Sequence, residues 1–411
     1  MKMKNQCQQL QEKLTILLQK SSDFSQREIF ALWTIFATIL GSASFSLTAV
    51  SRNFGREIGR NFLTKVLKKY SGIQKVIVKE FLKTLCNDLT KKQKIYLIID
   101  DTLLRKRGRC IFGSFLWYDH TISRQIQSIC LVNLVIVVEG HLVMILPWIL
   151  VNKLKKTKKK KKKKKEQDGK TKRAIKMLNQ IVLWLDEFQV TRNRIVVEAD
   201  SWFSSKPMLD FVRQMGLIYR IDGKKNYSVQ VPDKEAIKKA KTQKRGRKRR
   251  KFVKYTPLKE YLGASDSWAF FTNKPTKEQI RYRSAIISLK TGGRTKIYAF
   301  KRKGSKNPKF ILTNAKKNRP PTQETVYRDY SYRWRVEEAH RDLKQQFGIQ
   351  KAQNRQEKVV HGFIHFISMM YSIWKLWAWK AKKLLNQTYS CPSWSERFHK
   401  YQIKYVFDEP V

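Results

Sequence analysis

Cysteine is scarce in this sequence, and its placement follows no pairing pattern. The 411 residues contain five cysteines, an odd number spread far apart, with no C-x-x-C pair. This usage excludes a disulfide scaffold and a cysteine-based zinc site, and it favours a reducing compartment. No Walker-type glycine loop and no Ser-His-Asp pattern stand out either. The N-terminal MKMKNQCQQLQEKL lacks an apolar stretch behind its basic residues, so we expect no secretory signal.

Long apolar runs are also lacking. A membrane-spanning helix needs about 18 or more consecutive apolar residues. Residues 29–50 are interrupted by serine, threonine and glycine, and residues 129–151 break at Glu139, Gly140 and His141. The first stretch predicts buried helices and the second predicts two strands joined by a tight turn. We therefore expect no membrane partner.

Acidic residues are few compared with basic ones. Asp and Glu total 32 against 87 for Lys and Arg, a formal net charge of +55 distributed along the whole chain. Such an excess predicts a polyanionic partner. By charge alone nucleic acid is the first candidate and an anionic membrane surface the second, and we expect the partner to be nucleic acid and not a membrane. The length allows one large domain with additions, or two or three ordinary domains.

The order of the patterns along the chain predicts an α/β protein. Helical spacing comes first, then an apolar strand at IYLIIDDT, and then the strand and helix alternation of an α/β layer. We predict a lysine-rich loop at residues 153–172. It could bind phosphate groups, but we favour a surface insertion without a function of its own. The run KRGRKRRK at 244–251 is either a DNA contact or a solvated loop. The predicted regions are a helical N-terminal DNA-binding region (1–90), a first part of the core (91–223), a basic and β-rich insertion (224–318), a second part of the core (319–350) and a C-terminal helical region (351–411), whose last helix spans about 359–385.

Carboxylates follow two of the apolar runs. Asp100 and Asp101 close IYLII, and Asp200 closes RIVVEA. A charged carboxylate at the end of a buried strand is costly unless it is paired or binds a metal ion. Each aspartate could instead cap the turn that follows it. Taken singly, neither position decides between a metal site and a turn.

A third acid lies in the segment YSYRWRVEEAHRDLKQQFG. Its residues Tyr330, Arg333, Glu337 and Lys344 are spaced Y-x2-R-x3-E-x6-K, which on one continuous helix puts four side chains on one stripe. Ordinary ion pairs on a solvated helix face would give the same pattern. A tyrosine and two cations around one acid also suit a metal ligand beside a DNA phosphate.

At this point the chain resembles the DDE transposases of bacterial insertion sequences, specifically insertion sequence family four with its Y-R-E-K signature. The resemblance rests on DDT at 100–102, on EADSWFSS around Asp200, and on the spacing of Tyr330, Arg333, Glu337 and Lys344. It implies an RNase H-like mixed sheet flanked by helices, with an all-helical N-terminal region and a β-rich insertion between the second Asp and the Glu. Asp100 would lie on the first strand, Asp200 on the fourth, and Glu337 on a late helix. Asp101 stays the alternative to Asp100.

The resemblance also implies a chemistry. Asp100, Asp200 and Glu337 would be the catalytic residues and the metal ligands, holding Mg²⁺ with Mn²⁺ as a substitute, because carboxylate oxygens suit these ions. Tyr330, Arg333 and Lys344 would contact the DNA backbone. The protein would bind the terminal inverted repeats of a mobile element, cleave double-stranded DNA and join it to a target, as a homodimer in the bacterial cytoplasm at the nucleoid. The alternative is an RNase H-like nuclease, or an inactive or domesticated transposase that binds DNA without strand transfer.

Overall fold

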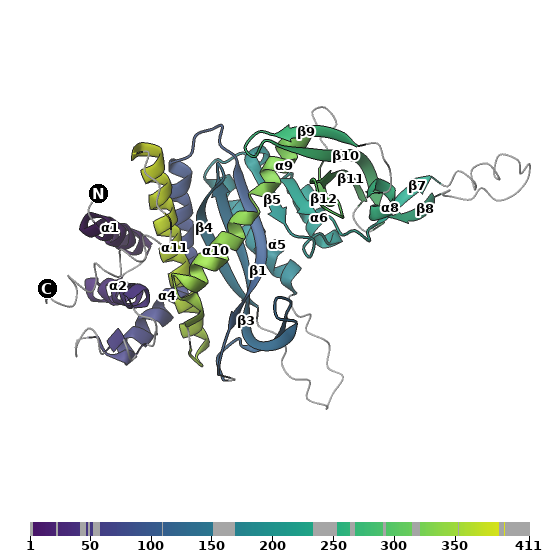
Figure 1. The fold of residues 1–411 in the computed structure, drawn as a ribbon. Helices are drawn as coiled ribbons and strands as arrows, with labels where there is room; N and C mark the ends of the chain where they lie inside the picture. The colour runs from purple at the N-terminus through teal and green to yellow at the C-terminus, as the bar shows by residue number, and fades with distance from the viewer. Residues whose placement is uncertain are drawn as a thin grey trace, which may run out of the picture. The chain divides into compact units, whose positions relative to one another are not determined.

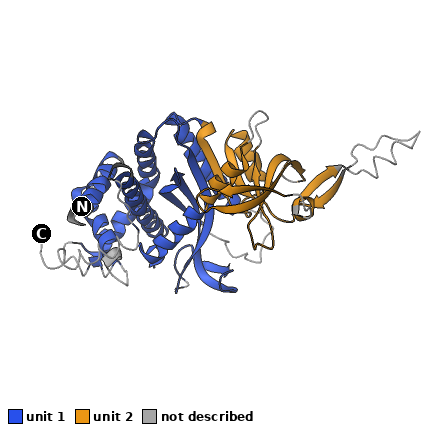
Figure 2. Cartoon of the chain, turned by 45° about the horizontal axis from the view of Figure 1, so that its top comes forward, with its two compact units in different colours: residues 1–191, 334–411 blue, residues 192–333 orange. Residues whose placement is uncertain are grey.

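The computed structural model divides the chain into two compact units. Unit 1 comprises residues 1–191 and 334–411, and unit 2 comprises residues 192–333 (Figure 2). Each unit is described by itself. The structure describes residues 3–21, 24–41, 47, 50–51, 58–108, 110–150, 169–232, 253–263, 268–290, 293–314, 321–351, 353–385 and 390.

Unit 1 contains antiparallel strands of strongly apolar sequence. Strand β3 pairs with β1 over Ser128–Val138 and with β4 over Cys130–Val138. It pairs with the short β2 over Arg124–Ser128. The turn between β3 and β4 has positive φ at Glu139 (51°) and Gly140 (78°), a conformation in which glycine avoids a steric cost. The predicted pair of strands is therefore confirmed. The bounds are β1 (Ile95–Arg105), β2 (Phe115–Asp119), β3 (Arg124–Val138) and β4 (His141–Leu150).

Helices surround the strands of unit 1. Helix α11 packs along α4 and along β4 (Figure 1), and the Ile145 N–H of β4 donates to Ser372 Oγ of α11 at 3.0 Å, so α11 satisfies part of the strand's edge. Helix α5 packs on β3, and α10 packs on β1, β3 and β4. None of the described helices has the length and apolar character that crossing a membrane requires. The bounds are α1 (Met3–Ser21), α2 (Gln26–Gly41), α4 (Arg60–Asn87), α5 (Lys170–Glu187), α10 (Trp334–Gln345), the short 3₁₀ turn η2 (Ile349–Lys351) and α11 (Glu357–Leu385).

Unit 2 contains a mixed sheet. Strands β5 and β6 are parallel, as a strand, helix and strand unit requires, and the other pairings in this unit are antiparallel, in the order β5-β6-β12-β11-β10-β7-β8 with β9 beside β10. The bounds are η1 (Arg192–Arg194), β5 (Ile195–Ala199), α6 (Lys206–Gln214), β6 (Ile218–Asp222), β7 (Ser228–Pro232), β8 (Val253–Pro257), α8 (Leu258–Gly263), β9 (Ala269–Asn273), β10 (Glu278–Leu289), β11 (Gly293–Lys301), β12 (Lys309–Thr313) and α9 (Gln323–Ser331).

An aromatic cluster joins α9 to the sheet of unit 2. The α9 side chains Val326 and Tyr330 pack with residues of β9 to β12, among which Phe271 and Tyr298 are buried. Helix α9 therefore covers one side of these strands and belongs to the same unit. The molecule is a mixed α/β protein with sheets flanked by helices, as predicted.

Three local predictions were wrong. The residues Tyr330, Arg333, Glu337 and Lys344 do not lie on one continuous helix. Helix α9 ends at Ser331 and α10 starts at Trp334, so Tyr330 and Glu337 do not share a helical stripe. Strand β1 does not end at Asp100 but continues to Arg105, still paired with β3. Asp200 follows the fifth strand and not the fourth, since β2 had not been foreseen.

Two predicted basic segments fall on residues that the structure does not describe. The lysine-rich loop lies outside the described residues up to residue 168, and its end, from Lys170 onward, belongs to α5. The run at 244–251 lies outside them entirely.

Candidate active site

Asp100 lies within β1, at the point where its burial ends. The five residues before it are buried and Asp100 is half-buried. Its Oδ1 accepts a hydrogen bond from the Asp101 N–H at 2.8 Å. Asp100 stands opposite Asn133 of β3, and directly opposite residues share one face of a sheet.

Helix α10 covers this face. Asn133 Nδ2 lies 2.7 Å from Nε2 of His340 on α10. Glu337 precedes His340 by three residues, so the two side chains lie on the same side of the helix. Asp100 and Glu337 are therefore carried by neighbouring elements of one unit, on surfaces that face each other.

Asp101 points to the opposite face of β1. Its Oδ2 pairs with Lys170 Nζ of α5 at 2.7 Å, and both side chains are 20% exposed. The Cys130 thiol donates weakly to the same oxygen at 3.9 Å, and burial raises the pKa of Cys130 to about 12. Asp101 is thus engaged in a structural ion pair, away from α10.

Asp200 belongs to unit 2, directly after β5. Its Oδ1 accepts from the Trp202 N–H at 3.0 Å, which is the turn-capping role that the sequence left open. Asp222 closes β6, the parallel neighbour of β5. Burial, aided by the Asp200 carboxylate, raises the pKa of Asp222, while Lys309 and Arg333 oppose the rise. Two carboxylates therefore meet at this end of the two strands.

Tyr330 and Arg333 lie near these acids in unit 2. Tyr330 is only 6% exposed, Lys309 Nζ lies 4.6 Å from its ring centroid, and its hydroxyl has no hydrogen-bond partner among the described residues. Burial, and then the charge of Asp222, raises the pKa of Tyr330. Arg333 follows the end of α9 and favours the charged form of Asp222.

A buried polar group beneath Asp200 was missed by the sequence reasoning. Glu198 is fully buried in β5, and neither of its carboxylate oxygens has a hydrogen-bond partner in the described structure. Burial, aided by Asp329, raises the pKa of Glu198 well above its usual range, against Arg220 and Arg333. Arg220 Nη2 lies 3.8 Å from Asp329 Oδ2, with both side chains almost inaccessible. An acidic residue inside the apolar run RIVVEAD was the available signal.

Lys344 lies in the last turn of α10 in unit 1 and is half-buried. Burial lowers its pKa, Asp119 opposes that change, and Arg105 adds to it. Lys344, the last of the three predicted DNA-contact residues, is therefore influenced by the cation Arg105, at the end of β1, and by the acid Asp119.

The three predicted acids fit the chemistry of a hard divalent cation, since all offer carboxylate oxygens. Unit 1 contributes Asp100 and Glu337, and unit 2 contributes Asp200. Among the residues that the structure describes, no three acidic, histidine or cysteine side chains are gathered as a metal site.

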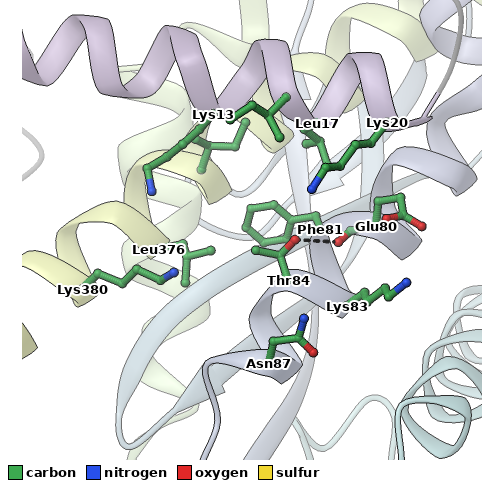
Figure 3. Close-up of a pocket in the computed structure, with 12 residues that line it drawn as sticks. Lys13, Leu17, Lys20, Glu80, Phe81, Lys83, Thr84, Asn87, Leu376 and Lys380 are labelled. Carbon is green, nitrogen blue, oxygen red and sulfur yellow. Dashed lines mark hydrogen bonds between the residues drawn. The ribbon is translucent and has the colours of Figure 1, made fainter.

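The pocket in Figure 3 is a different feature. It measures about 550 Å³ and lies among α1, α4 and α11. Four lysines and one acid, Glu80, are among its lining residues, and none of the predicted site residues lines it. Its excess of positive charge is the opposite of what a cation site requires.

Comparison with known proteins adds a family. The model described as DDE superfamily endonuclease matches residues 23–283, more than half of the chain. The match includes Asp100 and Asp200 and ends before Glu337. No curated protein matches the chain. The predicted RNase H-like α/β fold is confirmed by this match together with the observed mixed sheet and flanking helices.

Proposed function

Because the chain belongs to the DDE superfamily endonucleases, we propose that it is the transposase of a bacterial insertion sequence, of the family-four type with the Y-R-E-K signature. The family makes the chain a DDE transposase-like protein with DNA as its substrate class. The finer function is recognition of terminal inverted repeats, followed by cleavage and strand transfer. The formal charge of +55 supports a polyanionic substrate.

The observation that carries the proposal is the arrangement of β1 and α10 in unit 1. Asp100 shares a sheet face with Asn133, and Asn133 contacts His340 one turn after Glu337. This arrangement supports a site to which two acids from distant parts of the sequence contribute. The opposite orientation of Asp101, with its Lys170 ion pair, favours Asp100 as the first acid of the triad.

Asp100 and Glu337, with Asp200 from unit 2, would hold Mg²⁺ or Mn²⁺ through carboxylate oxygens. When bound, such ions supply Lewis-acid stabilisation of charge and a nucleophile at neutral pH. The protein's own part is to keep the three acids ionised and aligned. When these acids bind a proton, we expect it on a neighbour such as Asp222, whose pKa is raised.

Tyr330, Arg333 and Lys344 would contact the DNA backbone near the cleaved bond. Arg333 and Lys344 bring cationic donors, which suit phosphate oxygens. Action on two element ends as a homodimer, at the bacterial nucleoid, belongs to the same proposal, as does the division of the chain into the five predicted regions.

The test is cleavage of a labelled duplex carrying the DNA that flanks the gene, with Mg²⁺ or Mn²⁺. Asp100→Asn, Asp200→Asn and Glu337→Gln should each lower cleavage by more than about 100-fold, since even outer-shell partners of a metal typically account for 10–100-fold. Asp101→Asn is the matched control, because it removes the adjacent carboxylate on the other face and should keep most of the cleavage. Binding of the duplex should survive in all four variants.

Normal cleavage by the three variants would contradict the triad. Loss of cleavage in Asp101→Asn alone would move the first acid to Asp101. Incubation of a pre-cleaved element end with a target plasmid separates a transposase, which yields a joined product, from a nuclease, which does not.

A further inference from the structure

A dense basic segment follows the catalytic candidate on β1. The sequence RKRGR at 105–109 has four cations in five positions, beginning with the last residue of β1. Arg105 and Arg107 are exposed, and Lys106 is buried. This segment was not among the predicted DNA contacts.

Arg105 forms an ion pair with Asp119, whose carboxylate accepts further hydrogen bonds. Its Nη2 lies 3.2 Å from Asp119 Oδ2, and the side chains are 57% and 12% exposed respectively. Asp119 Oδ1 in turn accepts from the backbone N–H of Thr121 at 2.9 Å and from its hydroxyl at 2.5 Å. The hydrogen bonds from Thr121 and Arg105 hold the pKa of Asp119 below its usual range. A fixed carboxylate therefore orients a guanidinium that still projects into solvent.

Lys344 joins this pair from α10. Lys344 lies in the last turn of α10, which packs on β1, the strand that ends at Arg105. Burial lowers the pKa of Lys344, Asp119 opposes that change and Arg105 adds to it. Two cations around one buried acid leave one positive charge in excess. That excess is held in place and is not on freely moving surface side chains.

A further hydrogen bond links the end of β1 to the turn after α10. Lys106 Nζ donates to the Gln350 carbonyl at 2.7 Å, which ties the end of β1 to η2, the turn after α10. Arg105 precedes Lys106 by one residue, and Lys344 precedes Gln350 by six residues. The end of β1, which carries Arg105, is thus tied to the turn that follows α10, the helix that carries Lys344.

We propose that Arg105 and Lys344 form a phosphodiester-binding pair that grips the DNA backbone, with Asp119 as the positioning residue for Arg105. Asp119 occupies one terminal nitrogen of a guanidinium that has five N–H donors, so donors are left for a phosphate. The proposal rests on the proposed function, in which DNA is the substrate and Lys344 contacts it. It adds Arg105 and Asp119 to that site.

The experiment measures the affinity of the full-length protein for a fluorescent duplex, with a chelator present so that cleavage does not interfere. The variants are Arg105→Gln, Lys344→Met, their combination, Asp119→Asn, and Asp119→Asn with Arg105→Gln. Asp88→Asn is the matched control, because Asp88 is also an acid of unit 1 in an ion pair, with Lys380 at 2.6 Å.

The sign of the Asp119 effect is decisive. Removal of a negative charge from a basic protein would by itself tighten DNA binding, and Asp88→Asn should show that small change. Loss of the positioning contact should instead weaken binding in Asp119→Asn, by about threefold, which is within the range of surface ion pairs. That weakening should vanish when Arg105 is already glutamine.

Arg105→Gln and Lys344→Met should each weaken binding about tenfold, as expected for hydrogen bonds to charged groups, and the combined variant, which loses the phosphate contact, should lower the salt slope by about one. The combined variant should lose less than the product of the two, because both side chains hold one phosphate. Tighter binding by Asp119→Asn, or unchanged binding by Arg105→Gln, would overturn the pair. These readouts do not depend on cleavage, so failure of the transposase assignment would be seen separately.

Discussion

Lys106 is a buried amine whose charge costs stability. It is only 6% exposed, and burial lowers its pKa to about 7, far below the value of about 10.4 for a free lysine. Between these two values the unfolded chain holds a proton that the native protein has released. The free energy of unfolding should therefore rise as the pH rises from about 7 to 10, by at most about 1.4 kcal/mol per pH unit from this group.

Lys106→Met should remove this contribution. The difference in unfolding free energy between wild type and variant, measured by urea titration at several pH values, should increase steadily from pH 7 upward and be constant below it. Lys65→Met, on the exposed side of α4, is the control and should leave the pH dependence unchanged. Parallel curves for wild type and Lys106→Met would show that the amine keeps its proton in the folded protein.

Single residues differed in how far the sequence could predict them. Asp100 and Asp200 could be found because an acid follows a run of apolar residues, a local signal. Glu198 and Arg220 could not be assigned a role, because Asp329, which pairs with Arg220 and raises the pKa of Glu198, is brought to them only by the packing of α9 on β6. The preference for Asp100 over Asp101 likewise depends on which helix covers which face of β1.

Among the elements, helix and strand types were predicted well and the break between α9 and α10 was not. The sequence YSYRWR contains no proline or glycine to mark an end. The break is made by turn hydrogen bonds, from the Tyr332 N–H to the Asp329 carbonyl at 3.0 Å and from the Arg333 N–H to the Tyr330 carbonyl at 3.2 Å. Asp329 is itself held by tertiary packing, so the break has no local sequence signal.

Gly362 controls how closely α11 approaches α4. A Cβ added at this position would lie 2.0 Å from the carbonyl oxygen of Leu67, a backbone atom that cannot move aside without shifting the helix. Gly362→Ala should therefore lower the free energy of unfolding by about 1–3 kcal/mol, the usual cost of overpacking, or by more if the helices cannot separate. Chemical denaturation measures this change.

Gly72→Ala is the matched control, because Gly72 also lies within a helix of unit 1 but has open space around it. Alanine there should raise stability by about 0.5–1 kcal/mol through helix propensity. The two glycines should thus respond with opposite signs. Stabilisation by both substitutions would mean that α11 and α4 are not in close contact in solution.

At the scale of the whole molecule, the net charge of +55 predicts that DNA binding depends strongly on salt concentration. Each phosphate that is neutralised releases counterions, so affinity falls with salt in proportion to the number of phosphates contacted. Family membership and charge together predict this behaviour from the sequence alone.

Binding of a duplex of unrelated sequence should weaken by about 10³-fold or more between 50 and 200 mM salt, if about six or more phosphates are contacted. Fluorescence anisotropy in the presence of a chelator gives the slope directly. The combined Asp100→Asn, Asp200→Asn and Glu337→Gln variant should keep that slope, since acids do not neutralise phosphates, and should bind at least as tightly because three repelling charges are gone. A shallow slope in the wild type would mean that most of the positive charge does not reach DNA. A slope reduced by the three substitutions would mean that the acids organise the cations that do.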